Sequence, residues 1–217
     1  MPGCRYGVAR ESWEVPFLAV PEEVGALRRI LRLHLTHWGL PEVVESAELC
    51  VSELVANVIT HVGEGVPTTF RLGIRDTCVR IEVGDPDARS LPAPVAAGID
   101  AEHGRGLALL DAVADRWGVV LREDCKITWC ELATGLGMPT GHTGGRRVDR
   151  GEVVIGHYKD TVNPEVVSPL LGVALAEEAA VDVIADLLHW IRAHGRDPDA
   201  VLERAQAHYE TTLGGSG

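Results

Sequence analysis

The apolar residues of this chain change their spacing at Gly63–Gly65, and that change limits the folds open to it. Before these glycines, apolar side chains recur every three or four residues, which is the period of an amphipathic helix. After them, alternate residues are apolar, as in half-buried strands: Phe70, Leu72, Ile74, Val79, Ile81 and Val83. Helices followed by hairpin strands predict an α/β chain of the α+β sandwich type, in which helices back one sheet.

The other elements follow from helix caps, turn residues and apolar periodicity. Pro21 and Pro41 each open a helix, Gly39 ends the first, and Asp76-Thr77 turns the alternating segments into a hairpin. The expected elements are a strand at 13–20, helices at 21–39 and 41–61, strands around 70–75 and 79–83, a helix after Gly104, and a closing hairpin at 118–123 and 126–132.

Composition indicates a linker at 134–151, which is followed by a helical C-terminal extension at 152–217. The linker is rich in Gly, Thr and Arg, and amphipathic helices are expected at about 181–191 and 198–210. Glu178, Asp182 and Asp186 form an acidic ridge opposite the apolar face. That apolar face must be buried against the first domain, a second copy or another protein. The acidic ridge argues against an anionic membrane as the partner.

Bulk properties exclude several classes of protein. The formal net charge is −12, and nucleic-acid binding requires clustered Lys and Arg. No apolar run approaches the roughly 20 residues that span a bilayer, and the N-terminus lacks the pattern of a signal peptide. The five cysteines are scattered without a CxxC pair, which favours a reduced, cytoplasmic protein over a disulfide or zinc framework.

Glu53 and Asn57 form the first polar motif. Four residues apart on a helix, the carboxylate and the carboxamide share one face. An amide oxygen can ligate a hard cation, and a carboxylate one turn away can deprotonate a nucleophile, so the pair suits a magnesium-nucleotide site. Taken alone, the pair also fits the exposed polar stripe of an ordinary amphipathic helix.

Two further motifs follow along the chain. Asp85 ends an apolar strand, where a carboxylate can accept a hydrogen bond from an exocyclic amine such as that of adenine; it could equally be a turn residue. The sequence Gly104-Arg-Gly106-Leu107 opens a helix, where the backbone can approach a polyphosphate; it could equally be a flexible helix start. Neither the P-loop pattern nor the dinucleotide-binding GxGxxG occurs in the chain.

The histidines do not predict a metal centre. Metal binding could be considered for four histidines, but no HExxH spacing appears among them: His34, His37, His61 and His103. Surface or helix-capping roles are the interpretation for isolated histidines of this kind.

The order of these motifs resembles that of the Bergerat (histidine-kinase-like, GHKL) ATPase superfamily over residues 12–133. Glu53–Asn57 resembles its N-box, Asp85 its adenine-binding aspartate and Gly104–Leu107 its second glycine box. The stretch from His103 to Asp111 and the closing stretch from Lys126 to Leu132 are similar to the actinobacterial anti-sigma regulatory Ser/Thr kinases.

This resemblance implies a mixed, mostly antiparallel sheet backed by helices, with ATP and Mg²⁺ as cofactors. It implies that Asn57 ligates the metal and that Glu53 is the catalytic base toward a serine hydroxyl. Arg105 would steady the γ-phosphate or form a salt bridge on the lid side. The implied nucleotide-binding residues are Asn57, Asp85, His103, Gly104, Arg105, Gly106, Leu107 and Thr128.

The resemblance also implies a sigma factor or an anti-sigma antagonist as the protein partner, with no direct nucleic acid or membrane, and a homodimer. The chain departs from the family where Asp85 is followed by Pro86 and Asp87 instead of a glycine box, which removes backbone freedom beneath the base. A catalytically inactive interaction module is therefore the alternative function. A sensor-kinase fragment is disfavoured, since no phosphoacceptor helix pair precedes the domain. Residues 86–103 are expected to act as a lid over the nucleotide.

Overall fold

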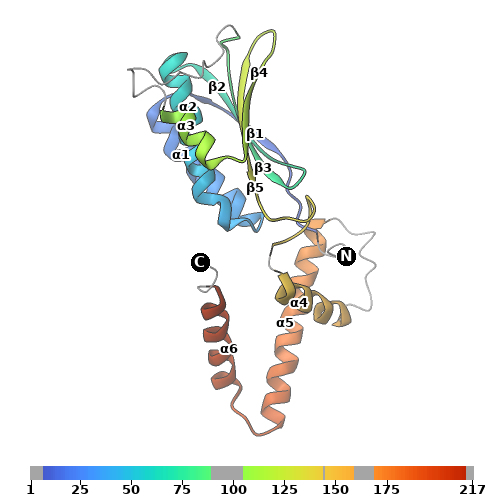
Figure 1. Ribbon diagram of the computed structural model, residues 1–217. Helices are drawn as coiled ribbons and strands as arrows, with labels where there is room; N and C mark the ends of the chain where they lie inside the picture. The colour runs from blue at the N-terminus through green and yellow to red at the C-terminus, as the bar shows by residue number, and fades with distance from the viewer. Residues whose placement is uncertain (1–6, 89–104, 144, 159–168, 214–217) are drawn as a thin grey trace. The chain divides into compact units, whose positions relative to one another are not determined.

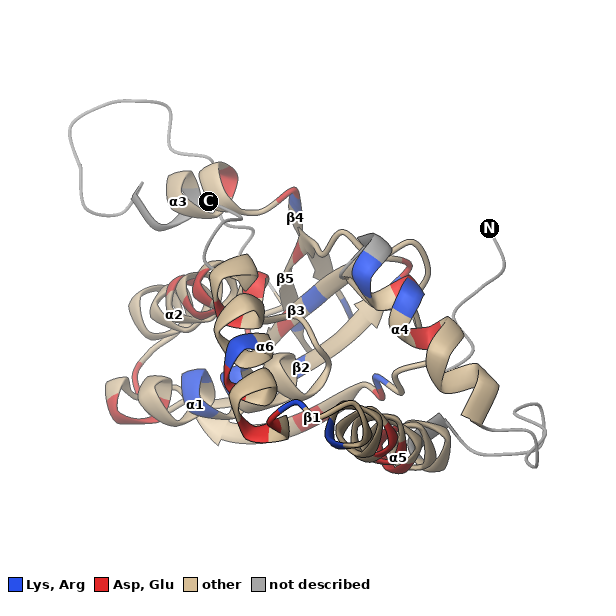
Figure 2. Ribbon diagram, turned by 90° about the horizontal axis from the view of Figure 1, so that it is seen from below, with Lys and Arg blue, Asp and Glu red and all other residues tan. Residues whose placement is uncertain are grey.

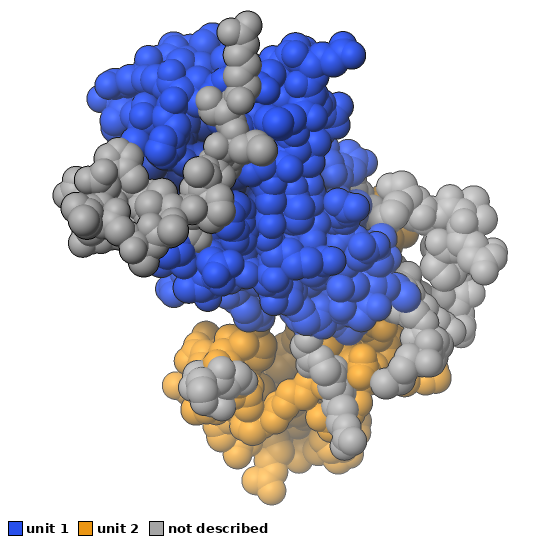
Figure 3. Space-filling model, turned by 45° about the horizontal axis from the view of Figure 1, so that its top comes forward, with its two compact units in different colours: residues 1–143 blue, residues 144–217 orange. Residues whose placement is uncertain are grey.

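The computed structural model describes residues 7–88, 105–143, 145–158 and 169–213 (Figure 1). These residues fall into two compact units, 1–143 and 144–217, which Figure 3 colours separately and which are described in turn below. Within the described ranges, no helix has both the length and the apolar character needed to cross a membrane.

The first unit contains a five-stranded sheet in the order β1-β2-β3-β5-β4. The four pairings between the described strands are all antiparallel, in agreement with the mostly antiparallel sheet that the family resemblance implies. The hairpin turn between β2 and β3 falls at Asp76, whose φ of 56° lies in the left-handed region that Asp tolerates better than most residues. The strands are β1 (Trp13–Leu18), β2 (Pro67–Arg75), β3 (Cys78–Asp85), β4 (Arg116–Leu121) and β5 (Lys126–Ala133).

Helices cover one face of this sheet (Figure 1). They are α1 (Pro21–His37), the short 3₁₀ helix η1 (Pro41–Val43), α2 (Val44–His61) and α3 (Arg105–Val113). α1 begins with proline at its first turn and is followed by Gly39 at φ 70°, the left-handed position that favours glycine. The two faces that meet are apolar, and their buried side chains include Leu27, Leu31, Leu35, Val51, Leu54, Val58, Phe70, Leu72, Ile81, Val83 and Leu110.

His34 corrects one expectation from the sequence. It is half-buried instead of lying at the surface, because its ring stacks on Trp13 at a centroid distance of 4.5 Å. Burial lowers the pKa of His34, and the neighbouring His37 lowers it further. His34 therefore belongs to the packing between β1 and α1. His37 and His61 are exposed, and His103 lies outside the described residues.

The cysteines within the described ranges are free thiols. Cys50 of α2 and Cys130 of β5 meet in the core, where they are 1% and 0% exposed. Their hydrogen bond, together with burial, raises the pKa of the Cys130 thiol. Both thiols act here as small core residues, which is the common role of buried cysteine.

The second unit consists of α4 (Gly145–Tyr158), α5 (Pro169–Ala193) and α6 (Pro198–Leu213). α4 begins inside the 134–151 segment that the sequence indicates as a linker. Its half-buried side is made partly of glycine and a charged residue: Gly151, Glu152, Ile155 and Gly156. The sequence indicates a linker here because of its composition, which is rich in Gly, Thr and Arg.

α5 carries both the acidic ridge and a large apolar surface. Glu178, Asp182 and Asp186 are exposed, and Figure 2 shows acidic residues along this helix. Tyr158 of α4 lies beside the ridge, where burial and the Asp186 carboxylate raise the pKa of its hydroxyl. The exposed apolar side chains of α5 include Leu171, Val181, Ile184, Leu187 and Trp190, the last with 61% of its surface exposed.

Candidate functional site

The candidate site lies where β3 and β5 run side by side on the helix-covered face of the sheet. The register pairs Val83 with Thr128 and Asp85 with Lys126. Because Asp85 alternates with the core residue Val83, its side chain and that of its partner Lys126 point toward the helices. All three polar residues are buried: Asp85 and Thr128 are 1% exposed and Lys126 is 2% exposed.

Two polar atoms in this corner have no hydrogen-bond partner. Asp85 Oδ1 accepts the backbone N–H of Asp87 at 2.9 Å, but Asp85 Oδ2 accepts no hydrogen bond. Thr128 Oγ1, one register pair along the same two strands, also has none. Leaving a buried polar atom unpaired costs about 1–3 kcal/mol, so such atoms usually meet a partner from outside. This corner is therefore suited to the polar edge of a ligand.

Lys126 is the site residue that motif reasoning missed. Its ammonium Nζ lies 3.5 Å from Asp85 Oδ2 and 3.9 Å from Asp87 Oδ2. A signal was present in the sequence, because Lys126 alternates with Thr128 and Cys130 and so occupies an inward-facing position of the closing strand. A lysine at an inward-facing position needs a partner of opposite charge, since burying an isolated charge is costly.

The surroundings of Asp85 shift the pKa of its carboxyl in opposite directions. Burial raises the pKa of the Asp85 carboxyl, and this is the largest influence. The N–H of Asp87 and the ammonium of Lys126 lower it again, while the Asp87 carboxylate raises it. Lys126 is thus the cation that allows Asp85 to carry its charge in a buried setting.

The open face of the same sheet shows a different arrangement. There the guanidinium of Arg80 pairs with Glu82 at 2.6 Å and with Glu131 at 2.7 Å, and it lies 4.1 Å from the centre of the Trp129 ring. Arg116 also pairs with Glu131, at 2.9 Å. These charged groups satisfy one another, whereas the corner at Asp85 and Thr128 retains unpaired atoms.

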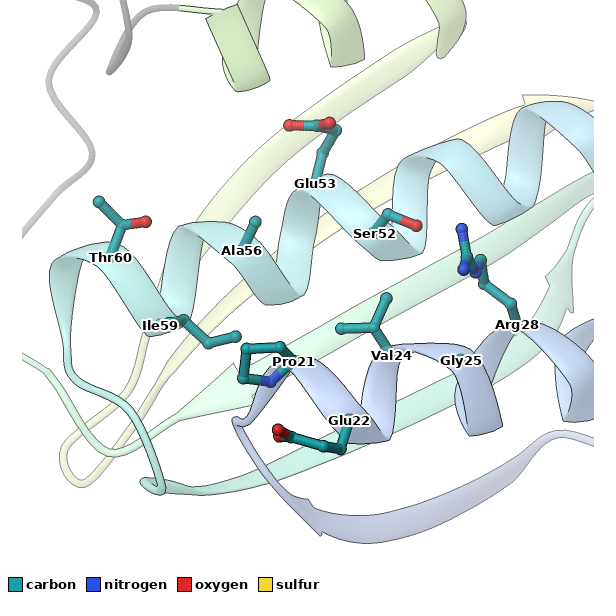
Figure 4. A pocket seen from close by; sticks show the side chains of 10 residues that line it. All are labelled: Pro21, Glu22, Val24, Gly25, Arg28, Ser52, Glu53, Ala56, Ile59 and Thr60. Carbon is teal, nitrogen blue, oxygen red and sulfur yellow. The ribbon is translucent and has the colours of Figure 1, made fainter.

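α2 carries Glu53 and Asn57 one turn apart; both are half-buried, and each directly precedes a buried residue, Leu54 and Val58. Glu53 lines a hollow of about 570 Å³ between α1 and α2 (Figure 4). In that view its carboxylate points away from Pro21 and the other α1 side chains that line the hollow. α2 itself packs against α3, β3 and β5.

The second glycine box is described only in part. α3 begins at Arg105, as the motif Gly104–Leu107 predicts for a helix start, and Gly106 and Leu107 lie in its first turn. His103 and Gly104 lie outside the described residues, as does the 86–103 segment beyond Ala88. The structure therefore brings Asp85 and Thr128 together, and Glu53 and Asn57 together. It leaves the role of the box itself a prediction.

The donor set fits a magnesium ion that is held mainly by phosphates. Among the described residues, no group of three or more His, Cys, Asp or Glu side chains could hold a metal ion. Mg²⁺ commonly takes one or two protein ligands and completes its octahedron with phosphate oxygens and water. A single amide such as Asn57 is consistent with that mode of binding.

The comparison with known families decides the class of protein. Residues 17–130 match the histidine kinase-like ATPase domain. The chain belongs to this family. The matched stretch runs from within β1 to within β5, so it contains Glu53, Asn57, Asp85 and Thr128. An uncharacterized protein of Streptomyces coelicolor is 47% identical over 85 residues, which cover 38% of this chain and 81% of that protein.

Proposed function

We propose that this histidine kinase-like ATPase domain protein is a cytoplasmic, ATP-binding regulator of the anti-sigma type. It binds a sigma factor or the antagonist of an anti-sigma factor, and it phosphorylates a serine of that antagonist. Membership of the ATPase family supports ATP binding. The resemblance of the 103–111 and 126–132 stretches to anti-sigma kinases supports the choice of partner.

The observation that carries the proposal is that two buried atoms, Asp85 Oδ2 and Thr128 Oγ1, have no hydrogen-bond partner. A carboxylate oxygen can accept a hydrogen bond from the exocyclic amine of adenine. A neighbouring hydroxyl can donate to a ring nitrogen of the base. ATP would thus give a hydrogen bond to two buried atoms that have none in this structure, and each atom so satisfied recovers part of its desolvation cost.

The chemistry of the proposed transfer divides between the two residues of α2. Asn57 would hold Mg²⁺ through its amide oxygen, and the metal would supply charge neutralisation to the phosphates. Glu53 accepts the proton of the attacking serine hydroxyl. The serine oxygen then forms a bond to the γ-phosphorus as the bond from that phosphorus to the β,γ-bridging oxygen breaks, and ADP leaves.

Replacing Asn57 with alanine is expected to abolish magnesium-dependent ATP binding while the protein stays folded. The amide is half-buried and alanine is a good helix former, so the stability of α2 should change little. Titration with ATP in the presence and absence of Mg²⁺ measures the effect. Thr60→Ala, three residues along α2 and exposed, is the control. A folded Asn57→Ala protein with wild-type ATP affinity would rule out the metal-binding role.

The whole proposal is tested by γ-phosphate transfer from ATP to a serine of a co-encoded antagonist protein. The second candidate is an inactive interaction module of the same fold. It is favoured by Pro86 and Asp87, which replace the glycine box after Asp85, and by Lys126, which already pairs with that carboxylate. This candidate predicts partner binding with no transfer to any antagonist.

The apolar surface of α5 supports a further part of the proposal, a homodimer. α5 leaves Ile184, Leu187 and Trp190 exposed, and large apolar side chains gathered on one exposed helix often mark an interaction surface. A second copy offers the same apolar surface, so pairing of the two extensions would cover both.

Charged residues on α5 are expected to prevent that pairing. The double replacement Ile184→Glu and Trp190→Glu should lower the mass in solution from dimer to monomer and leave ATP affinity unchanged, as measured by light scattering and nucleotide titration. Leu33→Glu on α1 is the matched control, since Leu33 is an isolated exposed apolar residue (70% exposed). A wild-type protein that is already monomeric, or a double variant that remains a dimer, would contradict the assignment.

A further inference from the structure

The corner formed by Asp85, Thr128 and Lys126, which we propose binds the base, contains a cation that recognition of adenine alone does not need. Lys126 Nζ lies 3.5 Å from Asp85 Oδ2, the same oxygen that has no hydrogen-bond partner. Lys126 is 2% exposed and comes from β5, directly opposite Asp85 in the register. An ammonium group has three donors and no acceptor. Its neighbours in the corner include the carboxylates of Asp85 and Asp87, at ion-pair distances.

A lone carboxylate placed opposite position 6 of the base does not match a 6-oxo group. The carboxylate accepts hydrogen bonds and matches the 6-amino group of adenine, whereas the O6 atom of guanine or hypoxanthine is also an acceptor. Two acceptors facing each other in a buried site repel, and each stays unpaired. Sites that leave buried polar groups unpaired reject the wrong analogue by about 10⁴-fold or more.

The ammonium beside the carboxylate changes that balance. With Lys126 present, the corner offers a donor next to the acceptor, and the hydroxyl of Thr128 serves as either. A 6-oxopurine presents O6 as an acceptor and N1–H as a donor. Lys126 can donate to O6 while Asp85 accepts from N1–H. Adenine is read by Asp85 and Thr128, and Lys126 then keeps its ion pairs with the two aspartates.

We propose that Lys126 makes this base subsite accept 6-oxopurine nucleotides as well as adenine nucleotides. The inference rests on the proposed nucleotide-binding function and adds the class of base to it. Three observations support it: Lys126 is buried, its ammonium lies 3.5 Å from Asp85 Oδ2, and neither Asp85 Oδ2 nor Thr128 Oγ1 has a hydrogen-bond partner. If Lys126 instead only neutralised Asp85, the site would discriminate strongly against 6-oxopurines.

The test is equilibrium binding of the full chain to ATP, ITP and GTP with Mg²⁺. ITP differs from ATP only in the 6-oxo group and the proton on N1, so the ratio of their dissociation constants isolates the chemistry of this corner. For the wild-type protein we expect ITP to bind within about tenfold of ATP, a difference of no more than about 1.4 kcal/mol. For Lys126→Met we expect the ITP:ATP ratio to rise by more than about tenfold, because O6 loses its donor. Arg122→Met, an exposed change in the neighbouring turn, should leave the ratio unchanged.

Each outcome decides a different claim. If none of the three nucleotides binds, the proposed function fails and this inference fails with it. If ATP binds and ITP binds more than about 100-fold more weakly to the wild-type protein, only the inference fails. An ITP:ATP ratio that is unaltered in folded Lys126→Met also overturns it. Should that variant not fold, the wild-type ratio decides alone.

Discussion

Lys126→Met is expected to lower the free energy of unfolding by about 3–5 kcal/mol, the usual effect of removing one partner from a buried ion pair. Lys126 is the cation nearest to Asp85 within the described residues, and both side chains are almost fully buried. Methionine has a similar length and fills the same space, so the loss reflects the uncompensated Asp85 carboxylate more than a cavity. Chemical denaturation of the two proteins measures the difference directly.

The pH dependence of this loss gives an independent check. Burial raises the pKa of Asp85, and Lys126 opposes that rise. A carboxyl whose pKa is raised in the folded state contributes stability that is fully present below its unfolded pKa and is lost as pH rises through its folded pKa. Without Lys126 the folded pKa of Asp85 rises further. Lys126→Met should therefore cost more at about pH 7.5 than at about pH 5, where more Asp85 is protonated and neutral.

A double-mutant cycle separates the ion pair from simple packing. Combined with Asp85→Asn, the methionine variant should lose clearly less stability than the two single changes together, because neither charge is left buried alone. Arg122→Met, which removes an exposed charge nearby, should stay within about 0.5 kcal/mol of the wild-type protein. Additive effects in the cycle, or a loss independent of pH, would show that Lys126 does not neutralise Asp85.

Local sequence patterns predicted most of the first unit, because its elements obey simple periodicities. The spacing of Leu27, Leu31 and Leu35 indicates α1, and the alternation from Val79 to Val83 indicates β3; both are observed. Asp76 marks the turn between β2 and β3 for a steric reason that acts over four residues. The strand order, in contrast, depends on pairings between distant segments, such as β3 with β5, and local patterns do not predict it.

Two features could not be obtained from local patterns. α4 begins within a stretch rich in Gly, Thr and Arg, so the composition there indicated a linker instead of a helix. The pairing of Lys126 with Asp85 joins residues 41 positions apart, and only the register of β3 with β5 brings them together. The candidate site was thus predicted through its motif residues, while the cation that balances its charge required the three-dimensional structure.

Glu53→Ala is expected to retain ATP binding and to lose phosphotransfer by about 10²–10⁴-fold, the usual contribution of a positioned general base. The carboxylate is half-buried on α2, one turn before Asn57. Asp85 and Thr128 belong instead to the strands β3 and β5. Glu53 is only half-buried and alanine is a good helix former, so its removal should leave the fold and base recognition in place. Single-turnover transfer of the γ-phosphate from ATP to an antagonist serine measures the rate, and titration with ATP measures the affinity.

Glu22→Ala is the matched control for this experiment. Glu22 is an acidic residue that lines the same hollow as Glu53, but it belongs to the first turn of α1 (Figure 4). Its removal changes the charge of the hollow by the same amount and should leave the transfer rate within a few-fold of wild type. Equal losses in the two variants would mean that the negative charge of the hollow matters and that Glu53 is not the base. An unchanged rate in Glu53→Ala would assign proton transfer to another group. A wild-type protein that binds ATP and transfers nothing would establish the inactive module instead.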